Sequence, residues 1–164
     1  MAGNVKAVPE GFHTITPHLS VRGADKTIEF YKKAFGAGVM GAHHTPDGRV
    51  MHAMLKIGDS FLMLADEYPG MGTPAPQTIG GSPVVLNIYV EDVDALWNQA
   101  VAAGAEVVMP LADQFWGDRY GQVKDPFGHG WALGSRKENV SPEEMEQRAK
   151  VAFAQMAKKA GHSA

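Results

Sequence analysis

The chain contains no cysteine, and this absence excludes disulfide bonds, thiolate nucleophiles and metal sites built from thiolates. It also lacks any apolar run near the roughly 20 residues that a membrane-spanning helix needs. Residues 1–10 show no basic segment followed by an apolar one, as a secretion signal would. No long basic run is present, and 15 Lys and Arg nearly balance 18 Asp and Glu. We therefore expect a cytoplasmic protein without a nucleic-acid or membrane partner.

The most informative feature that is present is an internal repeat with an offset of about 69 residues. Residues 15–21 alternate between apolar and polar side chains, as a half-buried strand does. A helical apolar pattern at 28–35 follows and stops at Gly36, a residue that suits a left-handed helix end. The same order returns with a strand pattern at 84–90 and a helix pattern at 93–101. The two halves are thus predicted to share one fold.

Each half then closes with a predicted hairpin. The turn Gly58-Asp59 is of the two-residue kind that matches strand twist, and 125–128 supplies proline and glycine to the second turn. The strands expected around these turns are 50–57 and 60–65 in the first half, and 120–124 and 130–133 in the second. Each half is therefore predicted to be a βαβββ unit.

The last segment stands outside the repeat and begins with a strong helix start. Ser141 is a suitable cap, Pro142 suits the first turn, and Glu144 occupies the capping-box position. The apolar face that follows packs either on its own domain or across a dimer. The regions expected along the chain are an N-terminal extension (1–12), a first βαβββ module (13–65), a linker (66–82), a second module (83–136) and a C-terminal helical tail (137–164).

Several short motifs, in their order and spacing, resemble the vicinal-oxygen-chelate superfamily of glyoxalases, bleomycin-resistance proteins and dioxygenases. They are Ile28-Glu29-Phe30-Tyr31, Phe35-Gly36 and Asp125-Pro126-Phe127-Gly128. Further motifs resemble its PhnB-like branch: Met51-His52-Ala53, Ile57-Gly58-Asp59-Ser60, Trp116-Gly117-Asp118-Arg119-Tyr120-Gly121 and Ser141-Pro142-Glu143-Glu144-Met145. Nothing resembles the glycine-rich turn of a methyl-donor-binding Rossmann fold, so we set aside the methyltransferase label that this branch sometimes carries.

The resemblance covers residues 13–136 and implies an α+β fold. Two βαβββ modules would form a curled mixed-sheet cup, the glyoxalase/bleomycin-resistance fold, here with an added C-terminal helix. The cup forms either within one chain or by exchange of modules between two chains. In enzymes of this family the cup holds a divalent metal ion, and the metal ligands stand on the first and fourth strands of each module.

The four metal-ligand positions of the family fall here on Thr16, Val85, Met63 and Ala132. Both pairs are 69 residues apart (85 minus 16; 132 minus 63), so the internal repeat supports this alignment. Divalent ions in such sites require imidazole nitrogen or carboxylate oxygen. Valine and alanine offer no donor, and methionine is a weak one. We therefore expect no metal ion and no other cofactor.

Two histidines are expected on the cup side of the first module. Successive side chains of a strand point to opposite faces, which places His18 toward the cup. The hairpin register pairs Met54 with Met63, and His52 shares their face. Two histidines fall short of the three or four protein ligands of a zinc site. We interpret them as hydrogen-bonded residues of a pocket wall or, in an enzyme, as the general base. His129 follows a tight turn and is expected to be exposed.

The cup is predicted to have an apolar and aromatic lining with a few polar groups, which is typical of a small-molecule site. The residues expected to contact a ligand are Thr16, His18, His52, Met54, Phe61, Met63, Val85, Asn87, Trp116, Arg119, Tyr120 and Gln122. In the alternative interpretation, the apolar residues of this set fill a closed core and contact no ligand. Trp116 either stacks on a planar ligand or anchors a dimer interface. Arg119 either holds an anionic ligand group or pairs with Asp118.

Three functions remain open from the sequence. The first is a metal-free pocket that binds or sequesters an aromatic or antibiotic-like small molecule, in a homodimer. The second is a lyase, isomerase or dioxygenase of the vicinal-oxygen-chelate type, with an atypical site that uses His18 and His52. The third is a structural homodimer without a ligand, because the edges of two curled sheets favour pairing with a second copy.

Overall fold

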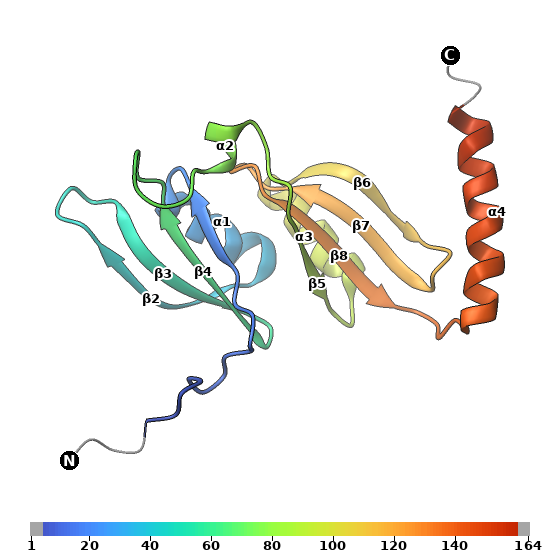
Figure 1. Cartoon of the computed structure of the whole chain (residues 1–164), viewed down its shortest axis with the longest axis horizontal. Coiled ribbons are helices and arrows are strands. Elements are labelled where there is room, and N and C mark those ends of the chain that lie inside the picture. Colours follow the sequence, from blue (N-terminus) through green and yellow to red (C-terminus); the bar gives the residue numbers. More distant parts are fainter. Residues whose placement is uncertain (1–4, 161–164) are drawn as a thin grey trace.

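The computed structural model describes residues 5–160 and contains two four-stranded sheets with helices (Figure 1). The first half contains β1 (His18–Val21), α1 (Ala24–Phe35), β2 (Gly38–His44), β3 (Val50–Ile57) and β4 (Ser60–Asp66). The second half contains β5 (Val85–Tyr89), α3 (Val93–Ala103), β6 (Glu106–Asp113), β7 (Asp118–Lys124) and β8 (Gly130–Arg136). A short helix that the sequence did not predict, α2 (Pro76–Ile79), lies between the halves, and α4 (Pro142–Ala160) follows them. The predicted α+β fold with a C-terminal helix is confirmed, but the two sheets are not closed into one cup within the chain.

The internal repeat is reproduced in the pairing of the strands. The strand order is β1-β4-β3-β2 in the first sheet and β5-β8-β7-β6 in the second. The parallel pairs place His18 beside Met63 and Asn87 beside Ala132, so equivalent positions are again 69 residues apart (87 minus 18; 132 minus 63). The predicted hairpin register, with Met54 opposite Met63, is also confirmed.

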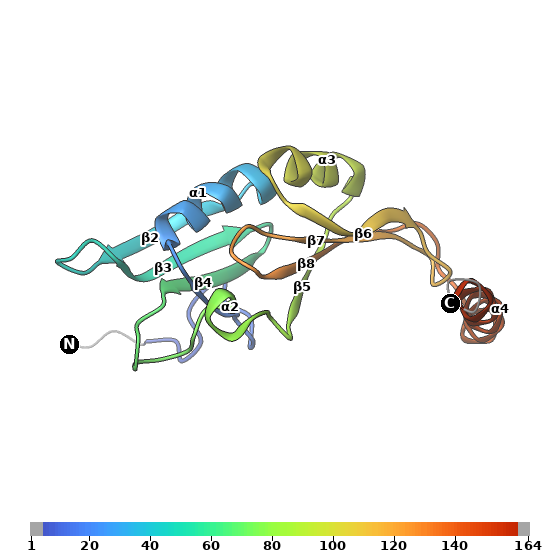
Figure 2. The same ribbon diagram turned by 90° about the horizontal axis from the view of Figure 1, so that it is seen from above.

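Each sheet buries one face beneath a helix. Leu55 and Leu64 of the first sheet and Leu133 of the second are fully buried, because their side chains belong to the core under the helices. Burial of each such side chain contributes about 1.5–3 kcal/mol. The helices α1 and α3 pack against each other, and Figure 2 shows both on the same side of the molecule. The opposite faces of both sheets are therefore turned away from the helices.

A carboxylate far along the chain fixes the start of α1. The N-cap residue Gly23 has a positive φ of 85° and no side chain that could cap the helix. Asp66, at the end of β4, accepts hydrogen bonds from the backbone N–H groups of Gly23 and Ala24, both at 2.9 Å. It also accepts one from the N–H of Val50 at 2.8 Å. A single carboxylate thereby joins α1 to β3 and β4.

A buried hydrogen-bond network joins the two halves of the molecule. Tyr31 of α1 donates to Asp125 Oδ2 at 2.7 Å, and Trp131 Nε1 donates to the same oxygen at 2.9 Å. Asp125 Oδ1 accepts the backbone N–H groups of Phe127 and His129, both at 2.9 Å. Burial, together with the charge of Asp125, raises the pKa of Tyr31 well above its ordinary value, so its hydroxyl remains a donor. This network connects the first helix to the last turn of the second half.

The expectation that His129 is exposed was wrong. The residue is 7% exposed, and its Nδ1 lies 4.0 Å from Asp125 Oδ2 without a hydrogen-bond partner among residues 5–160. The residue is drawn inward because its backbone N–H binds the buried carboxylate of Asp125. Burial lowers the pKa of His129 below its ordinary value of 6.5, and the charge of Asp125 opposes this shift.

Acid should therefore weaken the fold through His129. Below the ordinary pKa of 6.5, the unfolded chain binds a proton that the folded protein does not, so the free energy of unfolding falls as the pH falls below that value. We expect His129→Gln to reduce the slope of stability against pH in urea unfolding at pH 7.5, 6.5 and 5.5. The exposed His43 of β2 supplies the control, and His43→Gln should keep the slope of the parent protein. An unchanged slope in His129→Gln would contradict the assignment.

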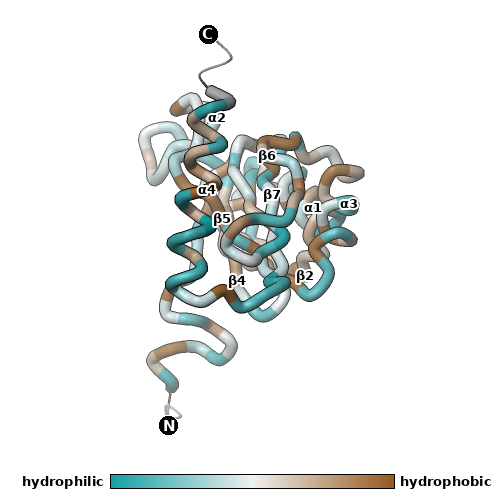
Figure 3. The backbone as a smooth tube through the Cα atoms, turned by 90° about the vertical axis from the view of Figure 1, so that its right-hand side faces the viewer, coloured by the Kyte–Doolittle hydropathy of each residue, from teal (hydrophilic) through white to brown (hydrophobic). Residues whose placement is uncertain are grey.

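The last helix, α4, stands beside the second sheet at the far end of the molecule (Figure 1). Its predicted cap is confirmed, because Ser141 Oγ accepts the N–H of Glu144 at 3.2 Å. Phe153 contacts Phe115 with 6.0 Å between ring centroids, yet Phe153 remains 62% exposed. Figure 3 looks onto α4 and shows apolar residues interleaved with polar ones along it. The apolar face of α4 is thus only partly covered by its own chain.

In the part of the chain that the structure describes, no helix is both long and apolar enough to cross a membrane. The cytoplasmic location expected from the sequence stays a prediction.

Candidate functional site

The candidate site lies on the two sheet faces that are turned away from α1 and α3. What we call the first sheet face consists of His18, Ser20, His52, Met54, Phe61 and Met63. Thr16, which was predicted to lie on this face, precedes β1, which begins at His18. What we call the second sheet face consists of Val85, Asn87, Tyr89, Asp118, Tyr120, Gln122, Ala132 and Arg136. Strand alternation assigns these residues, because their immediate neighbours in the strands belong to the buried core. Residues that the sequence placed in one cup therefore lie on two separate faces of one chain.

On the first sheet face the structure brings the two predicted histidines together. The rings of His18 and His52 are 5.8 Å apart between centroids and nearly perpendicular, at 89°. A cavity of about 460 Å³ lies beside His18. Its lining consists of His18, Ser20, Thr45, Met51, Ala65, Asp66, Tyr68, Met71, Gly72 and Thr73. Ser20 Oγ donates to the backbone oxygen of Thr73, so the segment after β4 forms one wall of this cavity. The sequence did not indicate this wall, because it depends on how the linker folds back.

The environment of His18 keeps its imidazole neutral near pH 7. Partial burial lowers its pKa below the ordinary value of 6.5, and the charge of His52 lowers it further. A neutral imidazole has one nitrogen that accepts and one that donates a hydrogen bond. Neither His18 nor His52 pairs with a carboxylate among the described residues. The pair can thus form hydrogen bonds with a ligand, but no acidic residue orients it as in a catalytic triad.

The second sheet face contains a strip of small residues along β8. What we call the small-residue strip consists of Gly130, Ala132 and Gly134, which occupy every second position of the strand. A methyl group added at Gly134 would lie 3.3 Å from the ring of Tyr89 and 3.6 Å from the ring of Tyr120. The two tyrosine rings therefore cover this end of the strip, where Gly134 is buried and Ala132 is 1% exposed. The ring of Tyr89 is itself 57% exposed and suits contact with a flat apolar molecule.

A buried carboxylate organises the polar groups next to this strip. Asp118 is 2% exposed, and its Oδ2 accepts hydrogen bonds from Tyr89 Oη at 2.7 Å and from Trp116 Nε1 at 3.2 Å. Its Oδ1 lies 3.4 Å from Nε of Arg136 and has no hydrogen-bond partner among the described residues. The hydrogen bond to Asp118, and secondly burial, raise the pKa of Tyr89 above its ordinary value. Gln122 Nε2 donates to Tyr120 Oη at 2.8 Å alongside. The sequence reasoning missed Asp118 and Arg136 as members of the site.

Trp116, just before β7, and Arg119, within β7, lie in different surroundings. Trp116 lies on the second sheet face, with its ring 5.5 Å from that of Tyr120. Arg119 points to the other side of β7, where it binds both carboxylate oxygens of Asp94 on α3, at 2.8 and 2.7 Å, and Asp113 at 3.2 Å. The alternative in which Arg119 pairs with Asp118 was therefore wrong, because adjacent residues of a strand point to opposite faces. Its guanidinium group is already bound to two carboxylates on the helix side.

The positions that hold the metal in enzymes of the resembled family do not fit a metal ion here. Thr16, which precedes β1, and Met63 of β4 are both half-buried, and neither carries an imidazole or carboxylate group. On the second sheet face Val85 and Ala132 have no donor atom at all. Among residues 5–160, no three His, Cys, Asp or Glu side chains gather closely enough to hold a metal ion. The donor set of this chain thus differs from that of a divalent metal centre.

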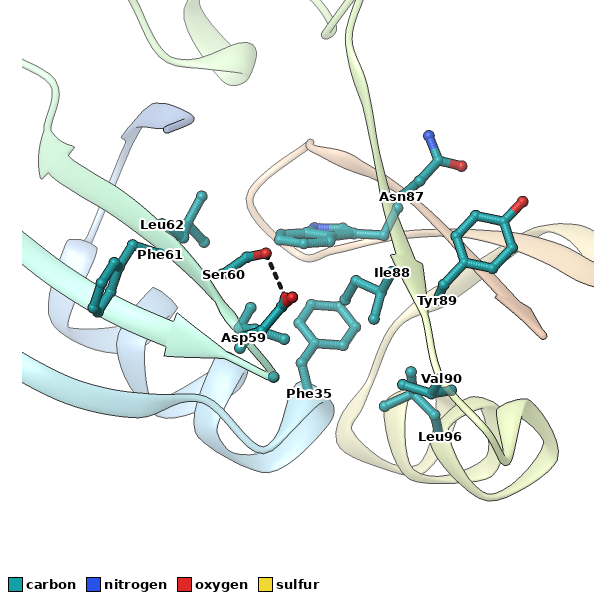
Figure 4. Close-up of a pocket in the computed structure, with 13 residues that line it drawn as sticks. Phe35, Asp59, Ser60, Phe61, Leu62, Asn87, Ile88, Tyr89, Val90 and Leu96 are labelled. Atoms are coloured by element: carbon teal, nitrogen blue, oxygen red, sulfur yellow. Dashed lines mark hydrogen bonds between the residues drawn. The ribbon is translucent and has the colours of Figure 1, made fainter. Parts of the chain in front are cut away.

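A cleft of about 370 Å³ separates the two halves on the helix side of β5 (Figure 4). Figure 4 shows Ile88 and Phe35 directed into the cleft, with Asp59 and Ser60 on the opposite wall. Asn87 points away from the cleft, toward the second sheet face. Ser60 Oγ donates to Asp59 at 2.8 Å, so the polar groups of this wall bind each other. The cleft is therefore mainly an apolar junction between the halves.

Comparison with known proteins gives a consistent result. Residues 11–133 match the family model described as Glyoxalase/Bleomycin resistance protein/Dioxygenase superfamily. An uncharacterized protein of Mycobacterium tuberculosis strain H37Rv is 45% identical over 135 residues, which cover 80% of this chain and 79% of the relative. The crystal structure of TioX from Micromonospora sp. ML1 has a TM-score of 0.61 and 26% identity, covering 76% of this chain and 98% of TioX. The PhnB protein of Bacillus cereus has a TM-score of 0.59 and 21% identity, covering 75% of this chain and 99% of that protein.

Proposed function

Because the chain belongs to the Glyoxalase/Bleomycin resistance protein/Dioxygenase superfamily, we propose that its open sheet faces bind a small organic molecule without a metal ion. The ligand would be an aromatic or antibiotic-like compound that the protein binds or sequesters. The proposal also assigns the chain to the PhnB-like branch, because the chain shares the sequence motifs of that branch. The likeness to the Bacillus cereus PhnB protein supports the fold of this assignment.

One observation carries the proposal: the family's metal positions hold residues without imidazole or carboxylate groups, and aromatic and hydrogen-bonding side chains lie near them. On the second sheet face Tyr89, Tyr120 and Trp116 supply aromatic rings above the buried small-residue strip, while Asn87 and Gln122 offer amide groups. An apolar surface with few, well-placed polar groups is the usual composition of a small-molecule site. The first sheet face adds the adjacent cavity and the neutral His18.

A second copy of the chain would complete the site. The two sheet faces of one chain lie on separate sheets. The second sheet face is exposed at Val85 and Tyr89, whereas the N-terminal segment, through Phe12 on Phe61, and the segment after β4 cover part of the first. A ligand on one face alone would leave much of its surface in water, whereas small-molecule sites bury most of the ligand. We therefore propose a homodimer in which sheet faces of two chains enclose the ligand.

The proposal is tested by binding of a neutral planar probe, 2-naphthamide, to the purified protein with and without EDTA. We expect the probe to raise the Tm and to release heat in calorimetry, equally in both conditions. Tyr89→Ala should weaken binding about tenfold, since it removes an aromatic contact. Phe153 of α4 is exposed to a similar extent, 62% against 57% for Tyr89, so Phe153→Ala is the matched control and should bind as the parent does.

Contrary outcomes separate the alternatives. Stoichiometric divalent metal in the purified protein, together with activity toward the methylglyoxal–glutathione adduct that EDTA abolishes, would overturn the metal-free site. Failure of planar probes to bind, with a stable dimer in sedimentation, would instead support a structural homodimer without a ligand.

A second candidate function rests on the histidine pair. The contact between His18 and His52, and the lowered pKa of His18, provide a neutral base on an accessible face, as a lyase, isomerase or dioxygenase with an atypical site would need. This function predicts turnover of a bound compound that both His18→Gln and His52→Gln abolish while binding persists.

A further inference from the structure

We propose that the second sheet face selects an anionic aromatic ligand, whose carboxylate or similar oxyanion binds the guanidinium group of Arg136. This inference rests on the proposed function and names the ligand class of that site. It follows from the placement of Arg136 at the end of the small-residue strip and from the way Asp118 holds it.

Arg136 follows the small-residue strip in the alternation of β8. Ala132 and Gly134 are buried beneath neighbouring side chains, and Arg136, the next residue on the same face, is exposed. The ring of Tyr89 lies over Gly134 and is 57% exposed, and its hydroxyl donates to Asp118, the carboxylate that holds Arg136. A ligand that stacks on the exposed ring of Tyr89 would therefore direct one end toward the guanidinium group.

Asp118 holds Arg136 by one side only. The ion pair joins Asp118 Oδ1 to Nε of Arg136 at 3.4 Å, and no other pairing of this arginine is formed in the described part of the chain. The two terminal nitrogens of the guanidinium group remain available, and a planar fork of this kind binds a carboxylate through two parallel hydrogen bonds. Asp118 is nearly fully buried, whereas Arg136 is 65% exposed. The carboxylate therefore holds the guanidinium group in place, and the guanidinium group is the part that would contact the ligand.

The remaining charges near this face do not compete for the same role. Arg119 binds Asp94 and Asp113 on the helix side of β7, and Arg148 binds Glu138 and Glu144 on α4. Burying an arginine under a ligand is favourable only where an anion pairs with it. A neutral ligand that covered Arg136 would desolvate an incompletely paired cation, so the geometry discriminates against neutral compounds.

The test compares two probes of the same ring, 2-naphthoate and 2-naphthamide, which differ by one negative charge. Calorimetry should show 2-naphthoate binding at least tenfold tighter. In two-dimensional NMR the indole N–H signal of Trp116, which donates to Asp118, should shift on binding. Arg136→Gln should remove the preference for 2-naphthoate, and Arg136→Lys, which keeps the charge without the fork, should retain part of it.

The matched control is the ion pair of Arg22 with Glu67 in the first half. Its arginine is 57% exposed and its carboxylate 11% exposed, which resembles the pair of Arg136 with Asp118. Arg22→Gln should leave the affinity for 2-naphthoate unchanged. Urea unfolding of each variant checks that the fold is retained.

The outcomes separate this inference from the function on which it rests. Equal affinity for the two probes, an unaltered preference in Arg136→Gln, or an equal loss in Arg22→Gln overturns the selection by Arg136 and leaves the aromatic site standing. If neither 2-naphthoate nor 2-naphthamide binds, both proposals are overturned.

Discussion

Replacing Asp125 by alanine should lower the free energy of unfolding by about 3–5 kcal/mol, the largest loss expected for any single carboxylate of this protein. The substitution removes the acceptor of four hydrogen bonds at once, two from side chains and two from the backbone. Because the site is buried, water cannot replace that acceptor. For a chain of this length we expect the Tm to fall by roughly 10 °C or more. Urea unfolding followed by circular dichroism measures the effect.

Asp59 supplies the matched control, since it lies in the hairpin turn of the first half and is exposed there. Asp59→Ala should change stability by less than about 0.5 kcal/mol. Tyr31→Phe removes one hydrogen bond to the Asp125 carboxylate and should cost about 1.5–3 kcal/mol. A double-mutant cycle between Tyr31 and Asp125 should show coupling of about 1 kcal/mol or more. A loss below about 1 kcal/mol in Asp125→Ala would show that the two halves are not held together by this network.

Replacing Gly121 by alanine should destabilise the protein by about 3 kcal/mol, although the change adds a single methyl group. The new Cβ would lie 2.6 Å from the ring of Trp97 on α3 and 2.9 Å from two backbone atoms of Leu111 on β6. Gly121 is held in register by its pairing with Leu133 of β8, the pairs on either side of Leu111 join β6 to β7, and the indole ring of Trp97 is packed against the core. Thermal and urea unfolding should both report the loss.

Gly41 of β2 tests whether the effect comes from this contact alone. A methyl group added there meets no atom within 4 Å, and the backbone conformation is not one that favours glycine. Gly41→Ala should therefore be neutral or stabilise the protein by about 0.5 kcal/mol, since alanine restricts the unfolded chain. If Gly121→Ala is as stable as the parent, α3 is able to move away from the second sheet.

The repeat explains why much of the fold was predictable from the sequence. Alternation and helical periodicity are local properties, so the strands around Gly58 and the helix ending at Gly36 were placed correctly. The offset of 69 residues also predicted the equivalence that the strand registers confirm. The cap of α1 by Asp66 and the burial of His129 were not predictable, because both depend on groups that meet only after the chain has folded.

The candidate site was predictable only in part, for the same reason. Face alternation located His18 and His52 and brought them correctly to one face. The environment of Arg119 depended on Asp94, which lies 25 residues earlier on a helix, and no local pattern indicates that contact. Arg136 was not predicted as a site residue, because it is held there by its ion pair with the buried Asp118 on the neighbouring strand.

The sequence by itself determined the α+β fold, the matched halves and the lack of imidazole and carboxylate groups at the four family positions, because these follow from residue type and periodicity. Only the tertiary structure decided that the sheet faces of one chain stay separate, and that Asp118 and Arg136 belong to the site. The packing of α1 against α3 determines how the two sheet faces are placed, and the pairing of β7 with β8 brings Asp118 next to Arg136. Both contacts join residues distant in the chain, so local composition predicts neither.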